Sequence, residues 1–233
     1  MIRIEKTWTG GFEGALRGMR NPYESQDKSD SGLLCRITQE NDVCLFYENG
    51  WCTDYTDCYY CHYFGIGKAD MELAKKLIKA GPEHRKFLRM IHVQADVVAP
   101  RYWWQEASCY KWLSMNSSST MHLITKRELT IDDFSIDGSL DTKCLESVVN
   151  LLNFKIRACK NMSEDKKKQT FRDIKQLLPE SYNQLRTLDT NYEALLSIHH
   201  QRKNHRLSEW REFCQWVETL PYMAEFLEVK DAD

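Results

Sequence analysis

Four cysteines within one short stretch of the chain could hold a metal ion. Cys58 and Cys61 form a C-x2-C pair, a spacing that lets two thiolates bind one tetrahedral zinc ion. Cys44 and Cys52 could complete a four-cysteine site, which would staple a loop because it leaves no open coordination position for chemistry. The spacing of the four residues matches no standard zinc finger, so reduced thiols without a metal are the alternative interpretation.

A basic segment in the C-terminal part of the chain is a second candidate, a site for an anion or a base. Arg202 and His205 lie at helical spacing from Asn191, so we expect all three residues on one face of a continuous helix. The planar fork of an arginine suits a phosphate or a pyrimidine carbonyl. Cations also stabilise the end of a helix through its dipole, so a basic helix end without a ligand is the alternative.

The aromatic cluster RYWWQEASCYKW, at 101–112, is a third feature that suggests a pocket. It directly follows MIHVQADVVAP, at 90–100, whose β-branched residues predict a buried strand. Because side chains alternate along an extended chain, we expect one of Trp103 and Trp104 to pack inward and the other to point into a cleft. The hydroxyl-rich stretch at 114–122 is expected to form a loop.

Hydrophobic patterns in the first half of the chain predict the elements that must position these residues. The alternation in IRIEKTW, at 2–8, predicts a strand, and the glycines at 10–18 favour a loop. Apolar residues at helical spacing from Asp70 predict a helix that ends at AGP, 80–82. The cysteine-rich segment at about 33–65 has no clear period and is typical of an insertion.

The second half of the chain has mainly helical patterns. We expect helices over 141–160, from a capping Ser163 to Leu178, over 181–203 and over 208–219. Neither an internal repeat nor a low-complexity linker separates these segments. The simplest organisation is a single α+β domain over 1–233, with a small, mainly antiparallel sheet and a helical C-terminal half.

Composition and charge exclude several classes of protein. The 233 residues are 42% hydrophobic and carry a net charge of −2, which gives no general attraction to nucleic acids or anionic membranes. We therefore expect no direct nucleic-acid binding. No apolar run is long enough to span a membrane, and the N-terminus lacks a signal peptide's apolar stretch, so we expect a cytoplasmic protein. Its odd number of cysteines, nine, fits a reducing compartment.

Two segments resemble the flavin-dependent thymidylate synthases, in a divergent form of the kind found in phage and gut-bacterial genomes. The first is IHVQADVVAPRYWWQEASCYKWLS, at 91–114. It is similar to a strand of that family and to the residues that lead into the family's Arg-His-Arg signature, with Arg101 and Trp103 in register. Gln105, Glu106 and Ala107 stand at the signature positions themselves, where this chain departs from the family.

The second segment, at 175–210, is similar to the C-terminal block of the same family. Pro179, Asn191 and Arg202 fall at the family's spacing. Lys175 stands where the family usually has an arginine that holds the nucleotide phosphate. The family's histidine after Arg202 comes one residue early, as His205. Two further parts are less similar: the serine loop, kept as Ser114 and NSSST, and GPEHRKF at 81–87, which resembles a flavin-contacting motif.

The resemblance implies a fold, ligands and an assembly. Members of the family use FAD and a folate to methylate C5 of deoxyuridine monophosphate (dUMP), and they assemble as homotetramers with each site built from several chains. By this resemblance Arg202 and Lys175 would contact the nucleotide. Arg101, Gln105, Glu106 and Ser114 would line the mouth of the pocket, and Asn191 and His205 would contact flavin or serve as polar packing groups.

Three hypotheses follow for the function. The first is a divergent enzyme that methylates or hydroxymethylates C5 of a pyrimidine deoxynucleotide. The second is a catalytically inactive nucleotide-binding or regulatory protein on the same fold, because the cations of the signature are replaced. The third is an interaction protein whose cysteine-rich insertion is stapled by zinc. Flavin absorbance, nucleotide binding without flavin, and zinc content distinguish the three.

Overall fold

The computed structural model describes residues 2–35, 62–120, 124–138, 141–159 and 162–229. Its contacts divide the chain into two compact units. Unit 1 comprises Met1–Trp8, Val93–Thr190 and Ala194–Thr219, and unit 2 comprises Thr9–His92, Asn191–Glu193 and Leu220–Asp233. The single domain over 1–233 stays a prediction. No helix of the described residues is long and apolar enough to cross a membrane.

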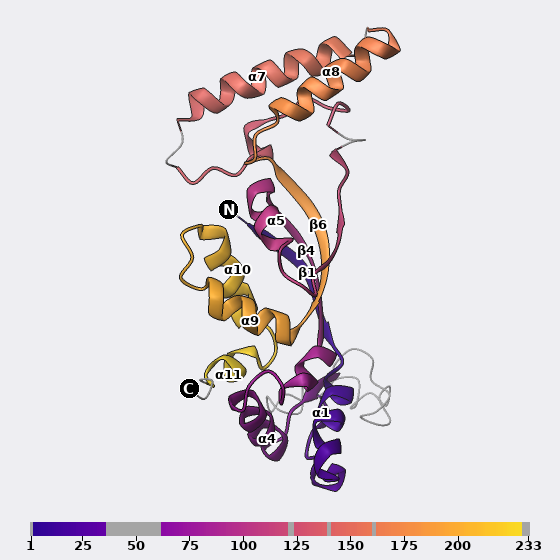
Figure 1. The fold of residues 1–233 in the computed structure, drawn as a ribbon, viewed down its shortest axis with the longest axis vertical. Coiled ribbons are helices and arrows are strands. Elements are labelled where there is room, and N and C mark those ends of the chain that lie inside the picture. The colour runs from indigo at the N-terminus through magenta and orange to yellow at the C-terminus, as the bar shows by residue number, and fades with distance from the viewer. Residues whose placement is uncertain (1, 36–61, 121–123, 139–140, 160–161, 230–233) are drawn as a thin grey trace, which may run out of the picture. The chain divides into compact units, whose positions relative to one another are not determined.

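Unit 1 is built on a four-stranded sheet with the order β1-β4-β6-β5 (Figure 1). The strands are β1 (Arg3–Gly10), β4 (His92–Pro100), β5 (Ser114–Ser117) and β6 (Asn183–Asn191). The two strands predicted from the first half of the sequence are confirmed, as are the α+β class and the small antiparallel sheet. In β4 the side chains of Val93, Ala95 and Val97 are buried, so alternate residues build one face of the core.

Strand β5 corrects the prediction of a loop over 114–122. Ser114 pairs with Asp189 and Ser117 with Arg186, in an antiparallel ladder along β6. Both serines are exposed, as suits short polar side chains on an edge strand. The backbone hydrogen bonds to β6 fix the extended conformation here, and a hydroxyl-rich composition does not reveal them.

Strand β6 also corrects the prediction of one long helix over 181–203. The first half of that range is extended, and α9 (Tyr192–Arg202) begins only after β6 ends. Asn191 therefore belongs to a strand, and His205 lies in the turn beyond α9, so neither shares a helix face with Arg202. The strand pairs with β5, so tertiary hydrogen bonding overrode the local helical pattern.

Helix α5 (Arg101–Ala107) follows β4 without a loop. Trp103 and Trp104 are each only 1% exposed, so the expectation that one of them points into a cleft is wrong. Neighbouring residues of a helix point about 100° apart rather than to opposite sides, and the surrounding core covers both rings. The ring of Trp103 lies 4.8 Å, centre to centre, from those of Trp104 and Trp210. Trp210 belongs to α10 (Ser208–Glu218), which confirms the predicted last helix. Figure 1 shows α5, α9 and α10 along one side of the sheet.

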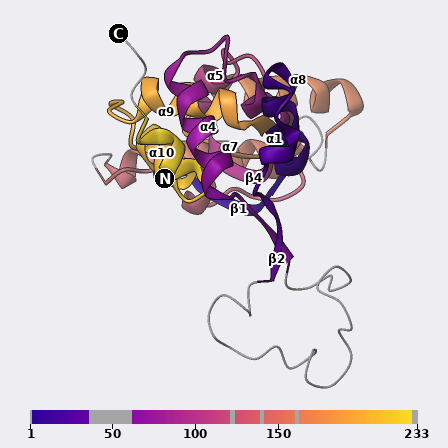
Figure 2. The same ribbon diagram turned by 90° about the horizontal axis from the view of Figure 1, so that it is seen from below.

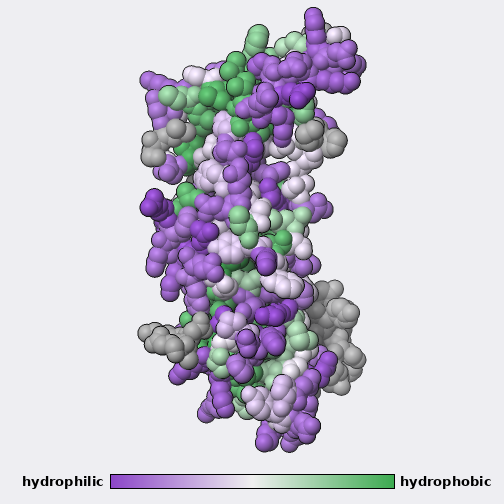
Figure 3. Space-filling model, viewed as in Figure 1, coloured by the Kyte–Doolittle hydropathy of each residue, from purple (hydrophilic) through white to green (hydrophobic). Residues whose placement is uncertain are grey.

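Helices α7 (Thr142–Cys159) and α8 (Glu164–Leu177) pack side by side in unit 1 and match their predicted ranges. Their core includes Leu152 and Ile174, both fully buried. Ser163 stands at the position before α8, but its side chain donates or accepts no capping hydrogen bond, so the predicted cap is not formed. Hydrophobic residues also reach the surface of this pair (Figure 3), among them Phe154, which is 65% exposed.

Unit 2 contains α1 (Phe12–Arg20), α4 (Lys68–Lys79), α11 (Met223–Leu227) and the short turns η1 (Asn21–Tyr23), η2 (Gln26–Lys28) and η3 (Lys86–Met90). Helix α4 confirms the helix predicted from Asp70. Helix α1 corrects the loop predicted at 10–18. A glycine is required just before the helix, at Gly11, where φ is +95° and a Cβ would lie 2.2 Å from the carbonyl oxygen of Met90. Nothing in the local sequence identifies that partner.

Buried charges tie α1 to α4 in unit 2. Arg20 forms an ion pair with Asp70, and their side chains are 5% and 0% exposed. Asp70 also accepts hydrogen bonds from Ser29 and Ser31. Burial by itself would raise the pKa of Asp70, but the hydrogen bonds from Ser31, Ser29 and Arg20 lower it below its ordinary value.

A two-stranded antiparallel sheet follows Ser31 in the chain. Strand β2 (Gly32–Cys35) pairs antiparallel with β3 (His62–Gly65), and Figure 2 shows β2 leading away from α1 and α4. The four cysteines of the predicted zinc site, Cys44, Cys52, Cys58 and Cys61, lie outside the described residues. No group of metal-binding side chains is found in the parts of the chain that the structure describes. The zinc site stays a prediction.

Candidate functional site

Arg202 lies at the end of α9, where residues from α10 and from α5 and the turn after it hold its guanidinium group. Its Nε donates a hydrogen bond to the hydroxyl of Tyr110 at 2.6 Å, and its Nη1 lies 3.3 Å from Oε2 of Glu106. The indole N–H of Trp210 donates to the same Oε2 at 2.8 Å. We refer to these four residues and His205 as the Arg202 cluster.

Stacking adds to these hydrogen bonds. The guanidinium carbon of Arg202 lies 4.9 Å from the centre of the Trp210 ring and 5.5 Å from that of Tyr110, within the range of cation–π attraction. Trp210 is 1% exposed, whereas the side chains of Arg202 and Glu106 are 25% and 37% exposed. A buried ring therefore supports a charged pair that a ligand can reach.

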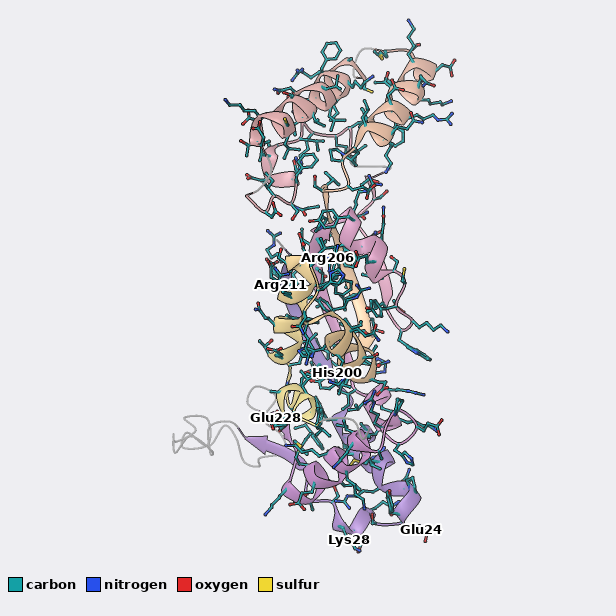
Figure 4. All side chains as sticks on the ribbon, turned by 60° about the vertical axis from the view of Figure 1, so that its left-hand side comes forward. Glu24, Lys28, His200, Arg206, Arg211 and Glu228 are labelled. Carbon is teal, nitrogen blue, oxygen red and sulfur yellow. The ribbon has the colours of Figure 1, made fainter. Side chains whose placement is uncertain are left out.

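His205 joins the Arg202 cluster from the turn between α9 and α10. Its Nε2 lies 3.8 Å from Oε2 of Glu106, and its Nδ1 accepts a hydrogen bond from the backbone N–H of Leu207 at 3.3 Å. Arg211 holds this turn by donating to the carbonyl oxygens of His205 and Arg206, at 2.6 and 2.8 Å. Arg206 and Arg211 are labelled in Figure 4. Contacts to its ring and to its backbone therefore hold His205 in place.

A second group of charges lies along an adjacent face of α5. Lys175, in the last turn of α8, donates to the hydroxyl of Thr120, which follows β5. Burial, and then the positive charge of Arg101, lower the pKa of Lys175 below its ordinary value. Arg101 lies 3.0 Å from Oε1 of Glu180, and Gln105 donates to Oε2 of the same carboxylate at 2.9 Å. We refer to these five residues as the Lys175 cluster.

The Arg202 and Lys175 clusters use different faces of α5. Arg101 and Gln105, one helical turn apart, both contact Glu180. Tyr102 and Glu106, which directly follow these two residues, contact α10 instead. Tyr102 donates to Glu209 at 2.5 Å, and Glu106 accepts from Trp210. Burial, followed by the hydrogen bond to Glu209, raises the pKa of Tyr102. Because consecutive helix residues point about 100° apart, the two clusters lie on adjacent faces of α5.

Two of the predicted site residues lie outside both clusters. Ser114 is exposed at the beginning of β5, opposite Asp189, whereas Arg101 lies beside the other end of β6 through a backbone bond to Tyr182. Asn191 is 6% exposed and belongs to unit 2. Of the eight residues proposed for ligand binding, Arg202, Glu106 and His205 come together in one cluster, and Arg101, Gln105 and Lys175 come together in the other.

Unit 2 has a cavity of its own, of about 330 Å³. It is lined by residues of α1, η1, α4 and η3 and by the segment before η3, including Met19, Tyr23, His84, Phe87 and Met90. His84 and Phe87 belong to the stretch at 81–87 that resembles a flavin-contacting motif. Beside it, Arg85 forms an ion pair with Glu193 at 3.0 Å. The cavity is mainly apolar, with charged side chains at its rim.

Sequence reasoning missed four residues of the two clusters: Tyr110, Trp210, Thr120 and Glu180. A signal existed for Tyr110, because it follows Glu106 by four residues in an aromatic stretch. Glu180 directly follows the recognised Pro179. No sequence signal pairs Trp210 with Glu106 or Thr120 with Lys175, because those contacts join distant parts of the chain.

Comparison with known proteins establishes the fold. Over 97% of its length the chain superposes on 97% of thymidylate synthase X (ThyX) from Helicobacter pylori, solved with FAD and dUMP, with a TM-score of 0.65 and 16% sequence identity. A second structure of the flavin-dependent thymidylate synthase ThyX from H. pylori, also with FAD and dUMP, matches with a TM-score of 0.65, 15% identity and 98% coverage of both chains.

Sequence comparisons add nothing to this likeness. No family model matches the chain, and no curated protein matches it. At the identities given above, the likeness shows the fold alone. The expectation of a flavin-dependent thymidylate synthase-like fold is thus confirmed.

Proposed function

We propose that the protein binds a pyrimidine deoxynucleotide of the dUMP type on a flavin-dependent thymidylate synthase-like fold. In its enzyme form the proposal is C5-methylation or hydroxymethylation of that nucleotide, with FAD as the redox cofactor and a folate as the one-carbon donor. The fold supports the substrate class, because the two ThyX structures hold dUMP. Whether FAD binds and whether methylation follows depends on the side chains of this chain.

The Lys175 cluster is the single observation that carries the proposal. A partly buried ammonium group, whose printed partner is the neutral hydroxyl of Thr120, lies within electrostatic range of the guanidinium group of Arg101. Arg101 is already paired with Glu180 at 3.0 Å, whereas Lys175 has no ion-pair partner among the described residues. A phosphate dianion would supply this missing counter-charge and accept hydrogen bonds from Lys175 and Thr120. Such a group is a suitable phosphate site.

The signature positions fit a flavin poorly. Gln105 is bonded to Glu180, Glu106 neutralises Arg202, and Ala107 is 1% exposed, so none of the three offers a positive charge to a pyrophosphate. This observation favours the second candidate function, a nucleotide-binding or regulatory protein without redox chemistry. Among the described residues of unit 2, Asn191 and the cavity beside His84 are the places proposed for a flavin.

A homo-oligomer, which the resemblance implies, is part of the proposal. The Arg202 and Lys175 clusters lie on adjacent faces of α5, because Gln105 and Glu106 are neighbours in the helix. A second copy that packs against these faces would add its own side chains to the site. The homotetramer implied by the resemblance would provide such a copy, and light scattering measures the number of chains directly.

Two measurements test the proposed function. An absorbance spectrum of the purified protein, before and after addition of FAD, reports flavin binding. Calorimetry with dUMP reports the nucleotide, with Lys175→Met expected to weaken binding about tenfold or more, in line with the loss of one charge-assisted contact. Lys168→Met is the matched control, since Lys168 is a 77% exposed lysine on the same helix. Equal dUMP binding by wild type and Lys175→Met would contradict the proposal.

A further inference from the structure

We propose that Glu106 determines ligand specificity at Arg202: it selects a neutral ring that presents a carbonyl beside an N–H, such as the imide edge of uracil, and it excludes anions. The inference rests on the proposed nucleotide binding and goes beyond it, because it assigns the two ends of the ligand to two places. The phosphate belongs to the Lys175 cluster and the base to the Arg202 cluster.

The two carboxylate oxygens of Glu106 differ in their contacts. The contacts given for its carboxylate to Trp210, Arg202 and His205 are each to Oε2, at 2.8, 3.3 and 3.8 Å. Among the described residues Oε1 has no hydrogen-bond partner. With a 37% exposed side chain, this oxygen is available as an acceptor for a ligand.

Arg202 keeps N–H donors that no described residue uses. Its Nε donates a hydrogen bond to Tyr110 and its Nη1 is ion-paired with Glu106, while Nη2 has no hydrogen-bond partner among the described residues. A guanidinium group carries five N–H donors, so donors remain for a ligand beside the free carboxylate oxygen. The pair therefore offers donors and an acceptor next to each other, which is the complement of a ring carbonyl next to a ring N–H.

The charge of Glu106 also disfavours an anion at Arg202. Glu106 and Arg202 cancel each other at contact distance, so a phosphate bound to Arg202 would also face a carboxylate and be repelled by it. A neutral ring meets no such repulsion. An ion pair already formed in the free protein also spares the ligand the cost of ordering two long side chains.

Trp210 and Tyr110 are positioning residues, because they hold the side chains of Glu106 and Arg202 in place. The buried indole of Trp210 donates to Glu106 and supports the face of the guanidinium group, so one side chain fixes both charged partners. The hydroxyl of Tyr110 accepts from Arg202 and donates to Gln201 at 3.3 Å, so it fixes the arginine alone. Loss of this hydroxyl should weaken binding without changing which ring edge is preferred.

Calorimetry with dUMP, N3-methyl-dUMP and inorganic phosphate tests the inference. Wild-type protein is expected to bind dUMP about tenfold or more tightly than its N3-methyl analogue, the effect of one hydrogen bond to a charged acceptor. Glu106→Ala should abolish this preference and bind phosphate more tightly. Glu106→Gln, which keeps the shape and an acceptor oxygen, should keep part of the preference. Tyr110→Phe should weaken dUMP binding and keep the preference in full.

The outcomes separate this inference from the proposed function. Glu128→Ala is the matched control, because Glu128 is a 46% exposed glutamate paired with Arg157 away from both clusters. If dUMP and its N3-methyl analogue bind wild type equally, or if the preference survives in Glu106→Ala, the specificity role of Glu106 is overturned while nucleotide binding stands. If dUMP does not bind to the wild-type protein at all, both the specificity role and the proposed function fail.

Discussion

Glu106 and Arg202 form an ion pair, with Nη1 of the arginine 3.3 Å from Oε2 of the glutamate. The carboxylate comes from the middle position of the Arg-His-Arg signature of the flavin-dependent thymidylate synthases, which this chain resembles. The arginine is thus already partnered before any ligand arrives. This relationship shifts the ligand expected at Arg202 from an anion to a neutral base, and it leaves the Lys175 cluster as the place for a phosphate.

Trp210→Phe tests whether the indole N–H holds this pair in place. The change removes the donor to Glu106 and part of a buried ring, so the free energy of unfolding should fall by about 1–3 kcal/mol and dUMP binding should weaken. Denaturant unfolding and calorimetry measure the two effects. Trp112→Phe, at a 68% exposed ring, should change neither. Unchanged dUMP affinity in Trp210→Phe would show that the indole only fills the core.

The lowered pKa of Lys175 predicts a pH dependence of nucleotide binding. A lysine with a lowered pKa loses its proton at a lower pH than an ordinary lysine, whose value is 10.5. Affinity for dUMP should therefore fall as the pH rises through that lowered pKa, while exposed lysines are still charged. Lys175→Arg should flatten the profile, because arginine keeps its charge throughout the range. A wild-type profile that matches Lys175→Arg at alkaline pH would exclude Lys175 as the phosphate ligand.

The buried pair in unit 2 predicts sensitivity to acid. Asp70→Asn leaves Arg20 buried without its counter-charge, and should lower the free energy of unfolding by about 3–5 kcal/mol at neutral pH. The folded pKa of Asp70 is below its ordinary 3.8, so its contribution is complete above 3.8 and is lost as the pH falls through the folded pKa. Thermal unfolding between pH 2 and 7 should show this loss in wild type and a smaller one in Asp70→Asn.

The substitution Gly11→Ala tests why a glycine stands directly before helix α1. The φ of Gly11 is +95°, and a Cβ there would lie 2.2 Å from the carbonyl oxygen of Met90. Gly11→Ala should therefore destabilise the protein by about 2 kcal/mol or more, through backbone strain and the clash. Gly14→Ala is the control: its Cβ would be 3.7 Å from the Met90 side chain, and alanine favours a helix. Equal unfolding midpoints for the two variants would contradict the packing described for α1.

Several elements follow from sequence alone because their signals are local. The alternation in β1 and β4, and the helical period in α4, α7 and α10, arise from residues that are neighbours along the chain and share one buried face. The resemblance at 175–210 likewise identified Lys175 and Arg202 as candidate ligand residues. These two residues now stand at the centres of the two clusters.

The tertiary structure alone decided where β6 gives way to α9 and which charges meet. A strand is fixed by hydrogen bonds to other strands, so the helical spacing of Asn191 and Arg202 could not reveal that the chain is extended up to Asn191. Glu106 in the sequence is an uncompensated carboxylate at a signature position. Folding brings it to Arg202 and Trp210, which lie far along the chain, because the core between α5, α9 and α10 packs there. Nonlocal packing of this kind leaves no pattern in the sequence.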